Sequence, residues 1–264
     1  MAKKRKTLGL ALGSGGSRGA CHIGAIQALI ENDIPIDFIT GSSMGAVVGG
    51  AYASGADIYE MEKRLLTMRI AEVFDMNVLP VSAGGLLKGR SAEKKLKPFL
   101  KCENIEETMI PFACTAVDIR SGKMHIFRQG DLLKAIRCSF SIPGVFEPVE
   151  HDGMLLVDGG LLERLPINEL KRMNADVIIS IDALGEVLPL NKKPNLFAIM
   201  MRAFNIVDWE KTQELHNDGD NFIITPDMSA RSQFSAKTIP AAIEAGKKAV
   251  NCKIDEIKKM LRID

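Results

Sequence analysis

Short apolar runs alternate with segments of helical period along most of this 264-residue chain. The runs have the length of buried strands, and the helical segments include Arg18 to Glu31 and the small-residue stretch Met44 to Ala53. Such alternation is typical of a mainly parallel sheet covered by helices, so it predicts an α/β fold of the three-layer α/β/α sandwich type. The predicted strands are Leu8 to Leu12, Ile36 to Thr40, Phe112 to Val117, Met124 to Phe127, Leu155 to Val157, Val177 to Asp182 and Phe222 to Thr225.

Both ends of the chain and one internal stretch depart from this alternation. Residues 1–6 form a basic tail that we expect to be solvated. Residues 237–264 place apolar side chains at helical spacing with lysines between them, which predicts an amphipathic helix. We expect its apolar face to pack on the core, with membrane contact as the alternative. Asn77 to Lys88, which contains one proline and two glycines, is predicted to be a loop or a lid.

Composition and charge narrow the functional classes. The chain is 46% hydrophobic and 25% charged, as expected for a globular protein, and we expect one domain spanning residues 1–264. Its formal net charge of +1 argues against a dedicated nucleic-acid binder. The five cysteines contain no C-x-x-C pair, so neither a disulfide framework nor a zinc site is predicted. The same cysteine pattern fits a reducing cytoplasm, where we expect the protein to be. No apolar run reaches about 18 residues, so we expect peripheral membrane contact at most and no span across a bilayer. The oligomeric state stays open.

The strongest chemical signal is the segment Gly41-Ser42-Ser43-Met44-Gly45. It matches G-x-S-x-G and lies between a predicted strand and a predicted helix. This pattern needs a sharp strand-to-helix turn in which the glycines allow close backbone approach and the central serine is presented at the helix N-terminus. There the helix dipole favours developing negative charge. The pattern therefore indicates a nucleophilic serine at position 43, against the alternative of a turn with a capping serine.

A second signal is the glycine-rich segment Gly13 to Gly19, directly after the first predicted strand. Glycines before a helix can direct several backbone N–H groups at one point, which suits an anion or the oxyanion of a tetrahedral intermediate. Nucleotide binding by an oxidoreductase is the competing interpretation, although position 18 is arginine where the dinucleotide pattern requires glycine. Because carboxyl ends of neighbouring parallel strands meet at one edge, we expect this loop to face Ser43.

A third signal is Asp158-Gly159-Gly160, after the predicted strand Leu155 to Val157. An acidic residue at a strand end, followed by two glycines, is well placed to project into a site. An aspartate that stabilises a tight turn explains the same pattern. The spacing alone leaves both interpretations open.

Together these segments resemble the patatin-like phospholipase family. Leu10 to Gly24 is similar to the opening of the family, Gly41 to Gly45 resembles its nucleophile elbow, and Asp158 to Gly160 its D-G-G motif. Ser141 to Pro148 resembles a further family segment. The likeness runs in family order from about Leu8 to Asp182. One departure is Ser14, which stands where the family has the first glycine of a triplet.

The resemblance implies a serine acyl-hydrolase with a Ser–Asp dyad that cleaves fatty-acyl esters of phospholipids or lysophospholipids. Ser43 would be the nucleophile and Asp158 its base, without a histidine. The backbone N–H groups of Gly15, Gly16 and Ser17 would hold the oxyanion. Arg18 would steady this loop or meet a phosphate head group. The expected partner is a lipid or acyl ester, and neither a metal nor an organic cofactor is implied.

Two alternatives and one further hypothesis accompany this interpretation. A Ser–His–Asp triad would select His216 as the base, by the chain order of α/β-hydrolases. A regulatory or adaptor protein could keep the same scaffold with little or no turnover. Finally, an acyl-chain groove is a hypothesis for four apolar residues before position 208, namely Phe197, Met200, Met201 and Phe204, which otherwise belong to core or lid packing.

Overall fold

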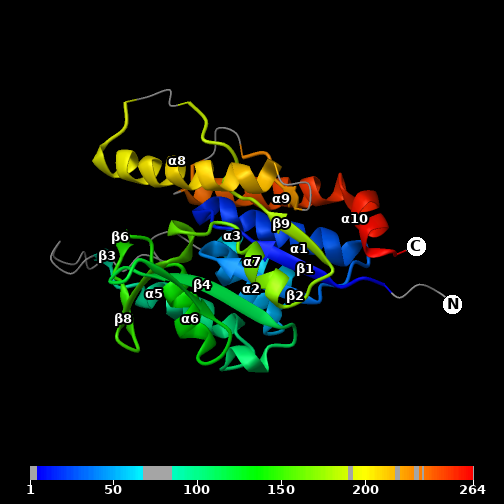
Figure 1. The fold of residues 1–264 in the computed structure, drawn as a ribbon, viewed down its shortest axis with the longest axis horizontal. Coiled ribbons are helices and arrows are strands. Elements are labelled where there is room, and N and C mark those ends of the chain that lie inside the picture. The colour runs from blue at the N-terminus through cyan, green and yellow to red at the C-terminus, as the bar shows by residue number, and fades with distance from the viewer. Residues whose placement is uncertain are drawn as a thin grey trace.

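The computed structural model describes residues 5–67, 85–189, 193–217, 221–228, 232–233 and 235–263. Within these ranges an eight-stranded sheet has the strand order β10-β9-β1-β2-β4-β8-β7, with β5 also paired to β4 (Figure 1). Its parallel strands are β1 (Leu8–Leu12), β2 (Phe38–Ser42), β4 (Phe112–Asp118), β9 (Val177–Ile181) and β10 (Phe222–Ile224). The antiparallel strands are β5 (Lys123–Phe127), β7 (Val149–His151) and β8 (Met154–Asp158). A separate small sheet pairs β3 (Gly85–Leu87) with β6 (Gly144–Phe146).

Helices cover both faces of the main sheet because successive strand residues point to opposite faces. Leu10 and Leu12 of β1 belong to the large core on one face, whereas Ala11 belongs to a smaller cluster on the other. The large core receives α1 (Cys21–Glu31), α2 (Met44–Ala53), α3 (Ile58–Thr67), α5 (Arg90–Leu96), α6 (Leu132–Ser139), α9 (Ile239–Asn251) and α10 (Ile254–Leu261). The smaller cluster receives α7 (Ile167–Arg172) and the end of α8 (Leu196–Asn217).

The predicted three-layer α/β/α class is confirmed. The expected bounds of β1 and α2 agree with the structure, while β2 begins two residues later than predicted, at Phe38. The short elements β3, β6, β7 and α7 have too few residues to show a period in the sequence. Of the stretch predicted as a loop or lid, residues 77–84 lie outside the described residues, and Gly85–Leu87 form β3.

The predicted C-terminal helix over 237–264 is wrong in one respect, because it is two helices. α9 ends at Asn251, whose side chain bonds to that of Asn32, and α10 begins at Ile254. Val250 of α9 and Ile257 of α10 are both fully buried. Figure 1 shows α9 lying alongside α1.

The basic tail is also less solvated than expected. Residues 1–4 lie outside the described residues. The Arg5 guanidinium binds both carboxylate oxygens of Asp37 at 2.6 and 2.7 Å, and the Lys6 N–H donates to the Leu261 carbonyl. This part of the tail therefore joins β1 to the start of β2 and to the C-terminus.

Candidate active site

The glycine-rich loop and the serine turn leave the sheet at the same edge. Leu12, the last residue of β1, pairs with Gly41 of β2 in parallel register. The chain therefore leaves both strands side by side, as the sequence predicts.

The position of Asp158 follows from how β4 is shared between its neighbours. Thr115 of β4 pairs with Ser42 on one edge and Ile126 on the other, whereas Ala116 pairs with Asp158 and with His125. Because β5 occupies one edge throughout, β2 and the antiparallel β8 must meet end to end along the opposite edge. This junction places Asp158 next to the residue that follows Ser42.

Ser43 occupies a sharp turn between β2 and α2. Its φ of 55° and ψ of −120° are unfavourable for a residue with a side chain, and its N–H donates to Ser139 Oγ at 3.0 Å. A Cβ on Gly45 would overlap the carbonyl of Leu12, so only glycine lets α2 start this close to β1. The structure thus shows the strand–turn–helix context that a nucleophile elbow requires.

Ser43 and Asp158 are joined by a short hydrogen bond. The Ser43 hydroxyl donates to Asp158 Oδ2 at 2.5 Å, a length typical of O–H···O⁻ bonds. The other carboxylate oxygen, Oδ1, accepts from the Gly160 N–H at 2.8 Å, and the Asp158 N–H donates to the Ser141 carbonyl at 3.0 Å. These bonds orient the carboxylate toward the serine hydroxyl.

Burial controls the protonation of Asp158. The residue is only 6% exposed, and removal from water raises the pKa of its carboxyl to about 7, against the lowering effect of the Ser43 and Gly160 bonds. The nearby charge of Asp208 raises that pKa further. A carboxylate with a pKa near neutrality is a stronger base than an ordinary aspartate and is still partly ionised at pH 7.

This shift predicts that Asp158→Asn makes the protein more stable at alkaline pH. The folded state binds the Asp158 proton more tightly than the unfolded chain does, so this contribution to stability is present below about pH 4 and is lost as the pH rises through about 7. Asparagine has no proton to lose. We expect the free energy of unfolding of the variant, relative to wild type, to increase by about 2–3 kcal/mol between pH 5 and pH 8.

Urea unfolding at the two pH values measures this difference. Ser43→Ala is the matched control, because it disrupts the same hydrogen bond but keeps the titrating carboxyl. Its stability should fall between pH 5 and pH 8 at least as much as that of the wild type, because the lost bond is one that lowers the pKa of Asp158. A gain of equal size at both pH values would show that the buried charge of Asp158 is not its cause.

The glycine-rich loop presents two unused backbone donors. The N–H groups of Gly15 and Gly16 have no acceptor within the described ranges. In contrast, the Ser14 N–H donates to the Arg164 carbonyl at 3.0 Å and the Ser17 N–H to the Gln233 carbonyl at 2.8 Å. The left-handed residue of the loop is Gly16, with φ of 53°, and not Ser14. The departure at position 14 therefore introduces no backbone strain.

Arg18 anchors this loop to the segment that follows β9. Its guanidinium donates to the Leu184 carbonyl at 3.1 Å, and burial lowers the pKa of the side chain, against the charge of Asp182. Of the two roles considered for Arg18, this contact with Leu184 supports steadying of the loop.

The histidines are engaged away from Ser43. His22 Nε2 contacts the Gly13 carbonyl at 2.7 Å, and burial lowers the pKa of the ring to about 4, so it is a neutral donor. His216 Nε2 lies 3.1 Å from Asp182 Oδ2. The rings of His125 on β5 and His151 on β7 make an edge contact, with their centroids 5.9 Å apart. The hydroxyl of Ser43 has Asp158, and not a histidine, as its side-chain acceptor.

Two cavities meet at Ser43. The larger one, of about 250 Å³, is apolar. The smaller one, of about 90 Å³, contains Asp158 and extends to Met201, Phe204 and Asp208 of α8. Ser43 and Gly16 border both. The lining of the larger cavity includes Val47, Val48, Phe99, Phe140, Val145 and Phe146.

These cavities change the predicted acyl groove. Met201 and Phe204 do line a cavity, but it is the smaller one, while Met200 is 47% exposed and the side chain of Phe197 lies outside the described part. The sequence analysis missed the larger cavity. It also missed Ser139, which binds the Ser43 N–H, because a serine in a short helix carries no distinctive pattern.

A buried ion network adjoins the smaller cavity and was also missed. Arg164, with a side chain only 1% exposed, binds Asp182 at 2.9 Å and Asp208 at 3.1 Å. Asp182 also accepts from His216, and the Arg164 guanidinium lies 5.3 Å from the centre of the Trp209 ring. The network links the segment after Asp158 to the end of β9 and to α8.

Two general properties of the described residues complete the site. None of their helices is both long enough and apolar enough to cross a membrane. Nor do their histidine, cysteine, aspartate and glutamate side chains form a cluster of three that could hold a metal ion.

Comparison with known proteins identifies the family of this chain. The family described as "Patatin-like phospholipase" matches residues 10–171, more than half of the chain. An uncharacterised NTE family protein of Mycobacterium tuberculosis is 43% identical over 178 residues, which are 67% of this chain and 49% of that protein. Lysophospholipase NTE1 of Candida albicans is 32% identical over 208 residues, 76% of this chain and 15% of the yeast protein. The matched part of this chain thus covers about half, or less, of the length of these relatives.

Solved structures show the same fold at low sequence identity. VipD of Legionella pneumophila has a TM-score of 0.53 at 14% identity, covering 96% of this chain and 67% of VipD. Human GIVD cytosolic phospholipase A2 has a TM-score of 0.53 at 10% identity, covering 97% of this chain and 58% of that protein. Because the family match covers more than half of its length, the chain belongs to the patatin-like phospholipase family.

Proposed function

We propose that this chain is a serine acyl-hydrolase that cleaves fatty-acyl esters of phospholipids or lysophospholipids through Ser43 and Asp158. The observation that supports this most directly is the 2.5 Å hydrogen bond from Ser43 to a buried carboxylate at the meeting point of two cavities. Its membership of the patatin-like phospholipase family makes a lipid ester the expected substrate class.

In the first step Asp158 accepts the Ser43 proton as the serine oxygen attacks the ester carbonyl carbon. The carbonyl oxygen becomes an oxyanion, which the N–H groups of Gly15 and Gly16 bind, and each such donor contributes about 3 kcal/mol in other hydrolases. The intermediate then expels the alcohol, which takes the proton from Asp158, and leaves an acyl group on Ser43. The Ser17 N–H is bonded to Gln233, so we assign the oxyanion donors to the two glycines.

A water molecule completes the cycle. Asp158 accepts a proton from the water while the water oxygen attacks the carbonyl carbon of the acyl-enzyme. Asp158 then gives this proton to the Ser43 oxygen, which leaves as the fatty acid is released. One carboxylate therefore acts as base and acid in both halves of the reaction.

The two cavities suggest how the substrate is oriented. The larger apolar cavity suits a fatty-acyl chain, since its lining offers almost no polar partner. The smaller cavity, with Asp158, Asn205 and Asp208 in its wall, suits the polar alcohol that leaves. We propose that the enzyme works in the cytoplasm and reaches its substrate at a membrane surface.

Narrowing the larger cavity should change the chain-length preference. Val47 is half-buried and lines this cavity. In Val47→Phe we expect the ratio of kcat/KM for p-nitrophenyl palmitate over butyrate to fall about tenfold, because a larger ring shortens the space for the acyl chain. Release of fatty acid from lysophosphatidylcholine, followed by mass spectrometry, should fall in parallel. Tyr59→Phe, an exposed change outside the cavity, is the control.

Either of two results would contradict the proposal. An unchanged ratio in Val47→Phe would remove the acyl chain from this cavity. Failure of the wild type to hydrolyse any ester would instead favour an adaptor on the same scaffold, although such a protein has no need of the Ser43–Asp158 bond.

A further inference from the structure

The first half of α8 exposes apolar side chains on the surface of the protein. Leu196 is 75% exposed, Ile199 51% and Val207 59%, at helical spacings that place them on one side of the helix. Half of the twelve exposed large hydrophobic side chains in the described part of the chain lie in these three turns, so they form a patch and are not scattered. We call this patch the outer face of α8; it consists of Leu196, Ile199, Met200, Phe204, Ile206 and Val207.

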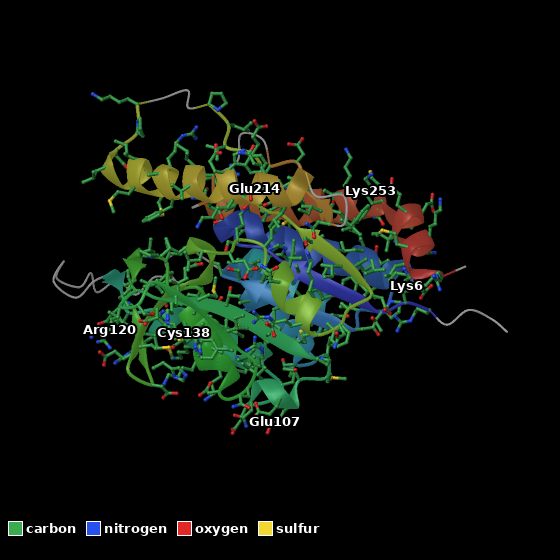
Figure 2. All side chains as sticks on the ribbon, viewed as in Figure 1. Lys6, Glu107, Arg120, Cys138, Glu214 and Lys253 are labelled. Atoms are coloured by element: carbon green, nitrogen blue, oxygen red, sulfur yellow. The ribbon has the colours of Figure 1, made fainter. Side chains whose placement is uncertain are left out.

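The opposite side of the same helix already makes the contacts with the protein body. Met201, Asp208 and Thr212, spaced by seven and four residues, are all buried. The second half of α8 is an ordinary surface helix, because its outward turns carry Glu210, Lys211 and the Glu214 that Figure 2 labels. The residues of the outer face are therefore not needed for packing of α8 on the core.

The outer face lies beside the cavity that contains the proposed catalytic pair. Phe204 belongs both to the outer face, at 38% exposure, and to the wall of the smaller cavity with Ser43 and Asp158. Met201, which also lines the smaller cavity, is buried. A layer seated on the outer face would therefore adjoin the cavity where an ester is to react.

Charge around the outer face also fits a phospholipid surface. Residues 196–207 contain one cation, Arg202, and no acidic side chain that would repel phosphate groups. The Arg202 guanidinium donates to the Leu188 carbonyl at 2.6 Å and thereby holds Leu188, itself 47% exposed, beside the helix. An apolar helix face bordered by a cation is typical of segments that lie in the membrane interface.

We propose that the outer face of α8 docks on a phospholipid surface, so that an acyl ester enters the site directly from the lipid layer. The inference rests on the proposed function in one point, the nature of the substrate; the docking itself does not require turnover. A lipid layer accounts both for the apolar face and for its continuity with the cavity of Ser43.

The test uses the double variant Ile199→Asp/Val207→Asp and vesicles of phosphatidylcholine with phosphatidylglycerol. We expect co-sedimentation with vesicles to fall about tenfold or more, and fatty acid release from vesicle lipid to fall with it, while hydrolysis of soluble p-nitrophenyl butyrate stays within about twofold of wild type. Ile119→Asp is the matched control, because Ile119 directly follows β4, lies outside α8 and is 50% exposed, close to the exposure of Ile199. Leu196→Asp, at the start of α8, serves if the double variant does not fold by circular dichroism.

Several outcomes would overturn docking on lipid. One is wild-type protein that stays in the supernatant, whatever its activity on soluble ester. Another is a double variant that binds vesicles as the wild type does. A third is a wild type that is dimeric in sedimentation velocity and a double variant that is monomeric, which would assign the face to a second copy. Vesicle binding that depends on α8 without turnover of any ester would instead support docking and contradict the proposed hydrolase.

Discussion

Ser43→Ala is expected to lower kcat/KM for p-nitrophenyl butyrate by about a thousandfold or more, while the protein stays folded. The reaction needs an oxygen nucleophile within reach of a base, and removing the nucleophile of a serine hydrolase leaves only what the oxyanion donors and substrate binding provide. Alanine fits the turn, since the loss is one hydroxyl whose acceptor, Asp158, keeps its bond from Gly160. Initial rates with p-nitrophenyl butyrate and a fluorophosphonate label measure the effect.

Two further variants test which residue acts as the base for Ser43. Asp158→Asn keeps the shape of the side chain but removes the base, so we expect a loss similar to that in Ser43→Ala. His216→Ala should keep activity within about threefold, because His216 contacts Asp182 and not Ser43. A large loss in His216→Ala would favour a triad, and labelling of Ser43→Ala by the fluorophosphonate would place the nucleophile elsewhere.

Features that depend on neighbouring residues were predictable from the sequence. The run Leu8–Leu12 and the small-residue segment Met44–Ala53 are bounded by glycines or by a turn, so their limits agree with the structure. The G-x-S-x-G segment carries its own geometric requirement, which Ser43 meets with a positive φ. The meeting of both loops followed from one assumption, that β1 and β2 are neighbours, and the register confirms it.

Features that depend on pairing between distant segments were not predictable in this way. Nothing in Leu155 to Val157 shows that β8 runs antiparallel and meets β2 along β4, yet that junction positions Asp158. The apolar cavity is lined by residues of α2, α3, α5 and the segment around β6, whose separate patterns match those of ordinary core residues. The period of apolar residues along a helix or strand shows which side of it is buried, but not where the packed elements leave a cavity.

The site requires two local conditions that are unfavourable for folding, one at Ser43 and one at Asp158. Ser43 has an unfavourable backbone conformation, and Asp158 is held in a place where its charge is poorly solvated. Both conditions persist only if the surrounding structure is rigid. Three features supply that rigidity around the smaller cavity: the bond from Ser43 to Ser139, the tie from Arg18 to Leu184, and the ion network of Arg164.

Arg164 was overlooked because arginine in a polar stretch usually belongs to the surface. Here it is 1% exposed and lies between two carboxylates. Burial disfavours the charge of Asp182, but the bond from His216 and the charge of Arg164 outweigh it, so the pKa of this carboxyl is lowered overall. For Asp208 burial prevails over the same cation, and its pKa rises to about 6. The guanidinium is therefore the charge that makes two buried carboxylates tolerable.

Arg164→Met should destabilise the fold by about 3–5 kcal/mol, because it leaves the buried Asp182 and Asp208 without their cation while keeping the volume of the side chain. Urea unfolding at pH 8, where both carboxyls are largely ionised, measures the loss. Arg120→Met is the matched control: its partner Glu150 lies 3.1 Å away, but both side chains are more than half exposed, and an exposed pair contributes at most about 1 kcal/mol. Adding Asp208→Asn to Arg164→Met should recover part of the loss, since one uncompensated charge is removed with it. Equal costs for the two arginine variants would show that the network is incidental to stability. A large cost of Arg164→Met without recovery in the double variant would show that the uncompensated charge of Asp208 is not the cause of the loss.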